Sequence, residues 1–296
     1  EPSEEPSEEP SEEPSEEPSD GPIEPALYYN LSDDGTYYIV SGYQGDVTDV
    51  VIPETYNGLP VKEIREFAFH GCDTITSVII PDSVTTIKEF AFSYCPNLMS
   101  VTLPDSLEII CSEAFRNSGF TSIEIPDGVT VKKSAFYECE SLTDVVIGEN
   151  VILEDSAFIW CDNLENVTLG NNITLGRDVF ETYNKNAYMN YNAYDNALYL
   201  GNSENPYMVL MSAFDYDVSS IRIHEDTQII YYEAFFFCIN LKEVVIPASV
   251  TVVGEDAFYE CLNLTDIYCE VQSQPEGWSE NWNNGCDATV HWGATP

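Results

Sequence analysis

The chain has 296 residues, and its 52 acidic and 10 basic side chains give a formal net charge of −42. This excess of negative charge should repel nucleic acid and anionic membranes, so we expect neither as a partner. No run of about 18 apolar residues is present, and we therefore expect no membrane span.

Residues 1–25 are dominated by a Pro-Ser-Glu-Glu repeat. Low hydrophobicity, like charges and regular proline leave this stretch nothing to bury. We expect an extended spacer that reaches about 60 Å, at about 3.1 Å for each residue. It is either a stalk that holds the rest of the chain off a cell envelope or a disordered terminus.

Residues 26–45 alternate between apolar and polar residues on both sides of Asp33-Asp34-Gly35. This pattern predicts a β-hairpin, with the Asp-Gly pair in its turn. We expect the hairpin to cap the N-terminal end of the structure that follows, because an uncapped end exposes apolar side chains and a free sheet edge.

From residue 46 onwards, a small residue followed by Phe recurs. These pairs are Ala68-Phe69, Ala91-Phe92, Ala114-Phe115, Ala135-Phe136, Ala157-Phe158, Val179-Phe180, Ala234-Phe235 and Ala257-Phe258. The steps between the Phe residues are 23, 23, 21, 22, 22, 55 and 23. A fixed period of this size predicts a solenoid, which favours one elongated domain over residues 26–296.

Each repeat continues from Phe to a Cys, then to an aliphatic residue, and then to an alternating segment that ends in Pro, as in Val101-Thr102-Leu103-Pro104. The alternation predicts a short strand with one buried face, and we expect the strands to stack into one parallel sheet. The recurring Cys are expected to be buried thiols that fill the core, since free Cys behaves as a small apolar group. Cys269 and Cys286 lie outside this pattern, and a disulfide between them stays open. An Asn that precedes the aliphatic residue in several repeats is expected to satisfy backbone groups from a buried position.

The step of 55 indicates an insertion, which we place at residues 183–219. It is rich in Tyr, and Ala197-Leu198-Tyr199-Leu200 and Tyr207-Met208-Val209-Leu210 predict a second hairpin laid against the solenoid. Its tyrosines either pack the hairpin onto the coils or form a binding surface, for which Tyr offers area and a polar tip. Residues 268–296 are rich in Trp and are expected to form a C-terminal cap with a last strand; an exposed platform for carbohydrate is the alternative.

The repeat C-x-x-L-x-x-V-x-I-P-x-x-V-x-x-I-x-x-x-A-F resembles the BspA-type (Treponema pallidum-type) leucine-rich repeat over about residues 46 to 292. Departures from it are local: Ser118 replaces Cys, Val179 replaces Ala, and Gly148 and Gly170 replace Pro. The resemblance implies a right-handed solenoid of the α/β-horseshoe type that is strand-rich and has few long helices. It also implies a surface-exposed bacterial protein used for binding.

The sequence offers no pattern for catalysis, a metal or a cofactor, and we expect none of the three. His70, His224 and His291 fall in distant coils, and there is no Gly-rich phosphate loop. The better candidate is the exposed side of the sheet together with the Tyr-rich insertion. The expected binding residues are Glu124, Asp144, Thr168, Arg222, Val245, Tyr268, Tyr191 and Tyr194.

We therefore expect a non-catalytic, monomeric module, secreted or anchored at the cell surface, that binds a protein or a glycan through the exposed sheet face. A structural spacer or envelope component is the alternative. A glycan-active enzyme with two close carboxylates is a third reading, because composition alone does not exclude such a pair.

Overall fold

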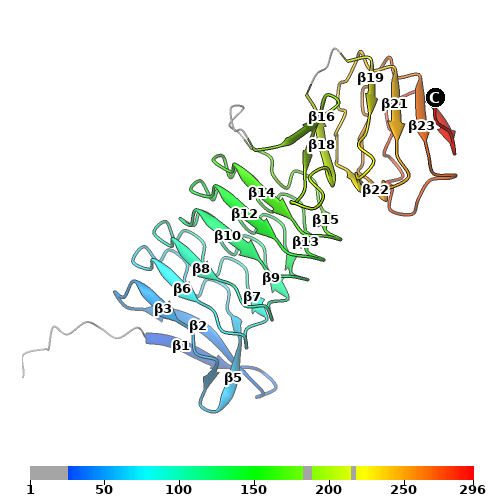
Figure 1. Cartoon of the computed structure of the whole chain (residues 1–296). Coiled ribbons are helices and arrows are strands. Elements are labelled where there is room, and N and C mark those ends of the chain that lie inside the picture. The colour runs from blue at the N-terminus through cyan, green and yellow to red at the C-terminus, as the bar shows by residue number, and fades with distance from the viewer. Residues whose placement is uncertain (1–25, 183–188, 215–217) are drawn as a thin grey trace, which may run out of the picture.

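The computed structural model describes residues 26–182, 189–214 and 218–296, so the spacer predicted for residues 1–25 lies outside it. The described ranges contain strands and turns but no helix, and they stack into a solenoid of about 11 turns (Figure 1). The prediction of a strand-rich solenoid is thus confirmed. The helical component of an α/β horseshoe is not found in these ranges.

Each coil contributes a first strand to one side of the stack. In the first run of coils these strands form two parallel sheets, β3-β6-β8 and β10-β12-β14, and in the second run they form a third, β19-β21-β23-β24. The single sheet expected from the sequence is therefore interrupted twice. The bounds are β3 (Asp49–Val51), β6 (Ser77–Ile79), β8 (Ser100–Thr102), β10 (Ser122–Ile125), β12 (Asp144–Ile147), β14 (Asn166–Leu169), β19 (Ser220–Arg222), β21 (Glu243–Ile246), β23 (Asp266–Cys269) and β24 (Thr289–Trp292).

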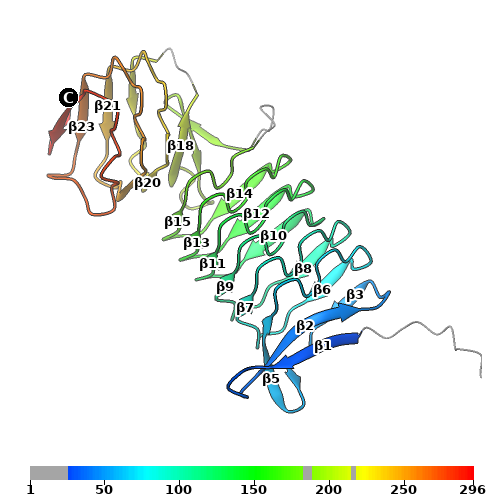
Figure 2. The same cartoon turned by 180° about the vertical axis from the view of Figure 1, so that it is seen from behind.

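A second strand from each coil lines the other side of the stack (Figure 2). In the first run these strands pair without a break from β5 to β15, and in the second run β20 pairs with β22. A short strand, β4 (Thr55–Tyr56), pairs antiparallel with β5. The bounds are β5 (Leu59–Ile64), β7 (Thr86–Ile87), β9 (Ile109–Ile110), β11 (Thr130–Val131), β13 (Ile152–Leu153), β15 (Thr174–Leu175), β20 (Ile229–Ile230) and β22 (Val252–Val253).

Both predicted hairpins are present. The first joins β1 (Ala26–Leu31) to β2 (Tyr38–Gln44), and β2 pairs parallel with β5. The second joins β17 (Ala197–Leu200) to β18 (Val209–Ala213), and β18 pairs parallel with β20. The strand β16 (Asn192–Tyr194) adds to the outer side of β17. Each hairpin thus begins one run of coils.

The second hairpin is a layer within the stack rather than an addition laid against it. Leu200, Val209 and Met211 belong to the hydrophobic core of the first run. Tyr199 and Leu210 belong to the core of the second run. Successive side chains of a strand point to opposite faces, so one hairpin covers the end of one core and the start of the next.

The Phe residues of the repeat form the expected ladder inside each run. Their rings stack at 4.6 to 5.8 Å from Phe69 to Phe180, and Phe235 lies 4.7 Å from Phe258. Each ring therefore gains most of its buried contacts from neighbouring coils, which no coil provides alone.

All nine cysteines are free thiols, so Cys269 and Cys286 are not paired. The repeat Cys does more than fill space, because its Sγ donates to the carbonyl of a Phe one coil earlier. Cys139 makes this bond to Phe115 at 3.1 Å. Ser118 makes the same bond with its hydroxyl to Phe92, at 2.9 Å. This shared bond explains why Ser can replace Cys at that position.

The turns around each Ala-Phe pair contain residues with positive φ, which explains why no helix forms there. Phe67, Phe90 and Glu113 have φ of 59°, 56° and 55°, two residues before the core Phe. Left-handed backbone at one residue interrupts a right-handed helix and costs about 1 kcal/mol for a residue with a side chain. The coil therefore turns sharply instead of continuing as a helix.

Candidate functional site

The first-strand sheets separate at one coil, between β8 and β10. That coil has Ser118-Gly119-Phe120 where its neighbour has Cys95-Pro96-Asn97-Leu98, and is therefore one residue shorter. A Cβ atom on Gly119 would lie 2.0 Å from the carbonyl oxygen of Pro96, so only glycine permits this close approach. The shortened turn also lacks the Asn that elsewhere donates to the preceding coil, as Asn97 does to Asp73 at 2.6 Å.

The interruption leaves a seam on the exposed sheet face, where β8 and β10 share no ladder in the fully described stretch 26–182. A hollow of about 460 Å³ lies over the seam. Its lining combines hydroxyl, carboxylate and apolar groups with no Lys or Arg, and is made by Met99, Ser100, Val101, Thr102, Leu103, Asp105, Ser122, Ile123, Glu124, Pro126, Asp144 and Val146. Such a mixed lining suits a polar ligand that also carries apolar surface.

Two of the predicted binding residues, Glu124 and Asp144, line this hollow. The Asp144 carboxylate accepts hydrogen bonds from the Thr143 hydroxyl at 2.6 Å and from the Asn166 amide at 2.7 Å, which fix its orientation. Glu124 has no hydrogen-bond partner within the described ranges and is exposed. Thr168 lies on β14, one coil beyond Val146, and is exposed beside the hollow.

The other predicted sheet residues lie in the second run. Val245 of β21 lies between Arg222 of β19 and Tyr268 of β23, and it pairs with both of them in the sheet register. Val245 lies on the predicted side of the sheet but is only 5% exposed, so the prediction that it is accessible for binding is wrong. The two long side chains on either side shield the shorter valine from solvent.

Tyr268 stacks on His291, with ring centroids 4.7 Å apart. The His291 ring bonds the Asp266 carboxylate through Nε2 at 2.8 Å, and the Thr265 hydroxyl donates to the other oxygen at 2.7 Å. These hydrogen bonds, that of His291 first, lower the pKa of Asp266. The end of the sheet face thus carries an aromatic pair beside an ionised carboxylate.

The two predicted tyrosines of the insertion are placed differently. Tyr191 is half-buried and packs against the core of the first run, and burial raises its pKa to about 12. Tyr194 is 37% exposed and contacts the His224 ring at 4.7 Å. The next residue, Asp195, accepts a hydrogen bond from the backbone N–H of Arg222 at 2.6 Å. The structure therefore brings Tyr194 and Arg222 to one place and separates Tyr191 from them.

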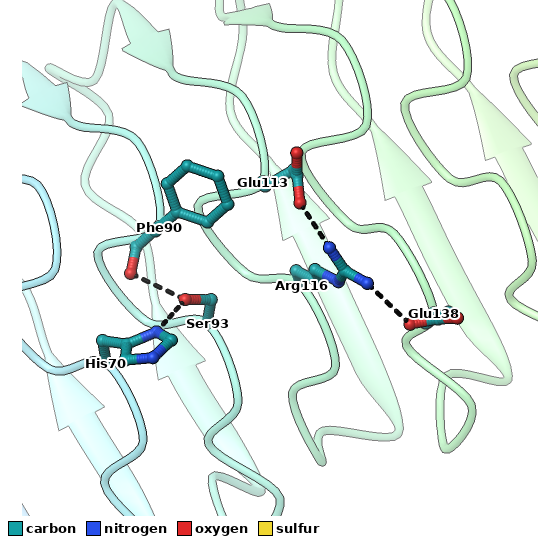
Figure 3. A network of polar contacts seen from close by, with 6 residues as sticks. All are labelled: His70, Phe90, Ser93, Glu113, Arg116 and Glu138. Carbon is teal, nitrogen blue, oxygen red and sulfur yellow. Dashed lines mark hydrogen bonds and ion pairs between the residues drawn. The ribbon is translucent and has the colours of Figure 1, made fainter.

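The polar network on the turns of the first run offers no activated nucleophile (Figure 3). Ser93 is fully buried, its hydroxyl donates to the carbonyl of Phe90 at 2.9 Å, and its oxygen lies 2.6 Å from Nδ1 of His70. Because the serine proton is already donated, His70 acts as the donor in this pair. Burial also raises the pKa of the Cys95 thiol to about 12, which disfavours the reactive thiolate.

Sequence reasoning missed the seam and the partnership of Tyr268 with His291. The step of 21 between Phe115 and Phe136 was the available signal for the seam, since every other step within the run is longer. Trp278 and Trp282 are buried in the core of the second run, so this part of the C-terminal segment is packing and not an exposed platform.

The solved structures that resemble this chain include bacterial leucine-rich repeat proteins. The T. pallidum leucine-rich repeat protein is 26% identical, with 51% of this chain and 83% of that chain covered and a TM-score of 0.41. A leucine-rich cell surface protein from Faecalibacterium prausnitzii is 20% identical over 94% of this chain and 96% of that chain, with a TM-score of 0.39. A leucine-rich repeat protein from Bacteroides ovatus is 22% identical over 92% and 99%, with a TM-score of 0.36.

No match was found among curated proteins. The model of the BspA type leucine-rich repeat region matches residues 62–187 and 211–278, in six copies. These two ranges make up well over half of the chain and contain the Ala-Phe turns and all of the first strands described above except β3 and β24. The chain belongs to the BspA-type leucine-rich repeat family.

Proposed function

We propose that this protein is a non-catalytic interaction module, secreted or held at the bacterial cell surface, that binds a protein or a glycan through its exposed sheet face. The hollow over the seam between β8 and β10 carries the proposal. It is the one place in the described part of the first run where the first-strand ladder opens, and predicted residues Glu124 and Asp144 lie in it.

The chemistry of the face supports binding rather than catalysis. The carboxylate of Asp144 is held in place by two hydrogen bonds, from the Thr143 hydroxyl and the Asn166 amide. Exposed Ile79 and Val146 flank the polar groups at 50% and 43% exposure. Alternating polar and apolar contacts of this kind are typical of recognition surfaces.

Support for the surface location comes from the family, from the likeness to a solved leucine-rich cell surface protein, and from the net charge of −42. The described ranges contain no helix long and apolar enough to cross a bilayer. In this proposal the acidic Pro-Ser-Glu-Glu segment separates the solenoid from whatever anchors it.

The proposal is tested by screening the protein against an array of host matrix proteins and glycans at physiological salt. We expect a saturable hit that Glu124→Lys and Val146→Arg each weaken at least about tenfold. Ile152→Arg is the matched control, because Ile152 is 41% exposed on the opposite row of strands. Hits that all three variants leave unchanged would contradict the site. Silence across the array would favour a structural spacer.

A further inference from the structure

A second surface, on the Ala-Phe turns of the second run, carries an apolar patch. Phe236, Phe237, Ile239 and Leu262 are 38%, 50%, 42% and 67% exposed. Phe236 contacts the ring of Phe237 at 4.8 Å and stacks on Tyr259 of the next coil at 5.9 Å. Ile239 and Leu262 hold the same repeat position, each directly after the buried Cys of its coil. We call these five residues the turn patch.

Phe237 has φ of 60°, in the left-handed region that disfavours bulky side chains. The same repeat position holds Gly71 and Asn117 in two other coils, and both residue types accept this conformation more easily. It also holds the aromatic residues Tyr94 and Trp160, so the positive φ belongs to the repeat. The cluster of exposed apolar side chains around Phe237, and not its backbone alone, indicates a contact with something outside the chain.

Two rings at the equivalent positions of the first run have a partner within the chain. The guanidinium of Arg116 lies over the rings of Tyr94 and Tyr137, at 5.3 and 4.4 Å. The same guanidinium pairs with Glu113 and Glu138 (Figure 3). Tyr94 and Tyr137 thus already have a cationic partner. Among the described residues, no cation–π contact involves the turn patch.

The charges around the patch indicate what would cover it. Glu260 holds the same repeat position as Phe237 in the next coil, so an acidic residue borders the patch. With a net charge of −42, a second copy of the chain and an anionic membrane would both be repelled. Basic groups around an apolar face would complement this surface in both respects.

We propose that the turn patch is a docking site for an amphipathic, basic segment of a partner protein. The apolar face of the segment covers Phe237 and Leu262, and a Lys or Arg side chain of the segment pairs with Glu260. This surface is separate from the sheet face, so it gives the protein a second partner or a second contact with the same partner.

The test uses the full chain and a model peptide made only of Leu and Lys, patterned so that Leu occupies one helical face. We expect saturable binding that Phe237→Asn and Leu262→Ser each weaken about tenfold. Phe237→Asn leaves the net charge unchanged and relieves the strained backbone, so the melting temperature should stay the same or rise. Loss of binding therefore cannot be attributed to unfolding or to charge.

Tyr94→Asn is the matched control, because Tyr94 has φ of 57° and is 42% exposed at the equivalent position of the first run. It should bind the peptide as the unmodified chain does. Equal binding by Phe237→Asn, or equal binding of a peptide with Glu in place of Lys, would overturn the proposal. So would attachment to phosphatidylcholine vesicles, or self-association in sedimentation, that Phe237→Asn abolishes. None of these results bears on the sheet face, whose residues are untouched.

Discussion

The two hairpins, β1–β2 and β17–β18, have the same internal geometry but different neighbours. Tyr29 pairs with Val40 and Tyr199 with Leu210, and each hairpin has a register shift directly before this pair. Val40 of the first hairpin also pairs with Ile64 of the next coil. In the same way, Leu210 of the second hairpin pairs with Ile230. A single alignment therefore superimposes both the antiparallel and the parallel partners.

The two hairpins differ in the face that points away from the coils that follow them, which we call the outer face. The outer face of the second hairpin carries Leu200, Val209 and Met211, which are buried in the core of the first run. By the same alignment, the first hairpin carries Asn30, Ile39 and Ser41, which are exposed or half-buried. One element thus serves as an end cap when its outer face is mainly polar and as a joint when that face is apolar.

This difference teaches that the segment near residue 200 is a second start as much as an insertion. The two runs of coils need not stack directly on each other. The hairpin pairs through β18 with β20 of the second run and buries its other face against the core of the first run. The joint is reinforced by polar contacts: the Tyr231 hydroxyl donates to Gly176 O at 3.0 Å and accepts from Val179 N at 2.9 Å. Arg177 and Glu255 form an ion pair across it.

Exchanging the outer-face residues should have the largest effect. Leu200→Asn places an amide in a fully buried apolar site and should lower the free energy of unfolding by about 3–4 kcal/mol. The reciprocal change, Asn30→Leu, adds an apolar group at an exposed site and should change it by less than about 0.5 kcal/mol. Urea unfolding of both variants gives the two changes in the free energy of unfolding. Equal effects would show that the two outer faces are not different environments.

Removing the tyrosine hydroxyl from the joint should have the next largest effect. Tyr231→Phe leaves the Val179 N–H and the Gly176 carbonyl without their partner and should cost about 1–3 kcal/mol. Arg65 is the equivalent residue at the first hairpin, because it follows Ile64 as Tyr231 follows Ile230. The Arg65 side chain is half-exposed, so Arg65→Ala should lower the free energy of unfolding by less than about 0.5 kcal/mol. A cost for Tyr231→Phe no larger than that of Arg65→Ala would contradict the joint.

The same Cys substitution should lower the stability of both runs by the same amount, in contrast to the different effects expected at the two hairpins. Cys139→Ala and Cys261→Ala each remove a hydrogen bond to a Phe carbonyl together with a buried thiol, and each should cost about 1–2 kcal/mol. The serine variants should recover part of the loss, as Ser118 does naturally at its own position. Thermal unfolding of the four variants provides the measurement. A larger loss for serine than for alanine would show that the thiol acts only by filling space.

Alkaline pH should weaken the joint by the smallest amount. Burial raises the pKa of Tyr231 above the ordinary value of about 10. The folded state therefore holds its proton where the unfolded chain releases it, so this stability is complete below about pH 10 and is lost as pH rises towards the folded pKa. Stability between about pH 9 and 11 should fall more steeply in the unmodified chain than in Tyr231→Phe. Parallel slopes would exclude a role for this phenol.

Much of the fold follows from the repeat. The Ala-Phe period predicted the stacked rings from Phe69 to Phe180, and the alternating segments predicted the first strands. These features are predictable because each repeats in phase, so every coil supports the interpretation of the next. Both hairpins were also predictable, since turn residues stand between short alternating runs.

Features that depend on contacts between different coils were not predictable. The hairpin at residue 197 has two buried faces only because cores lie on both sides of it. Val245 alternates as an exposed residue would, and its neighbours on two other strands bury it. The hollow at Glu124 arises from a one-residue deletion whose consequence appears only when coils stack. The expected Asn side chains do bond backbone carbonyls, as Asn163 does, but from exposed positions.

Hydrogen exchange of the Leu200→Asn variant, compared with the unmodified chain, tests most directly whether the second hairpin starts the second run. We expect the amides of β17, β18 and β20 to β24 to lose protection together, while those of β7 to β11 keep theirs. Loss confined to β17 and β18 would show that the hairpin is only an appendage on a solenoid that stands without it. Equal loss throughout the chain would show one cooperative stack with no joint at all.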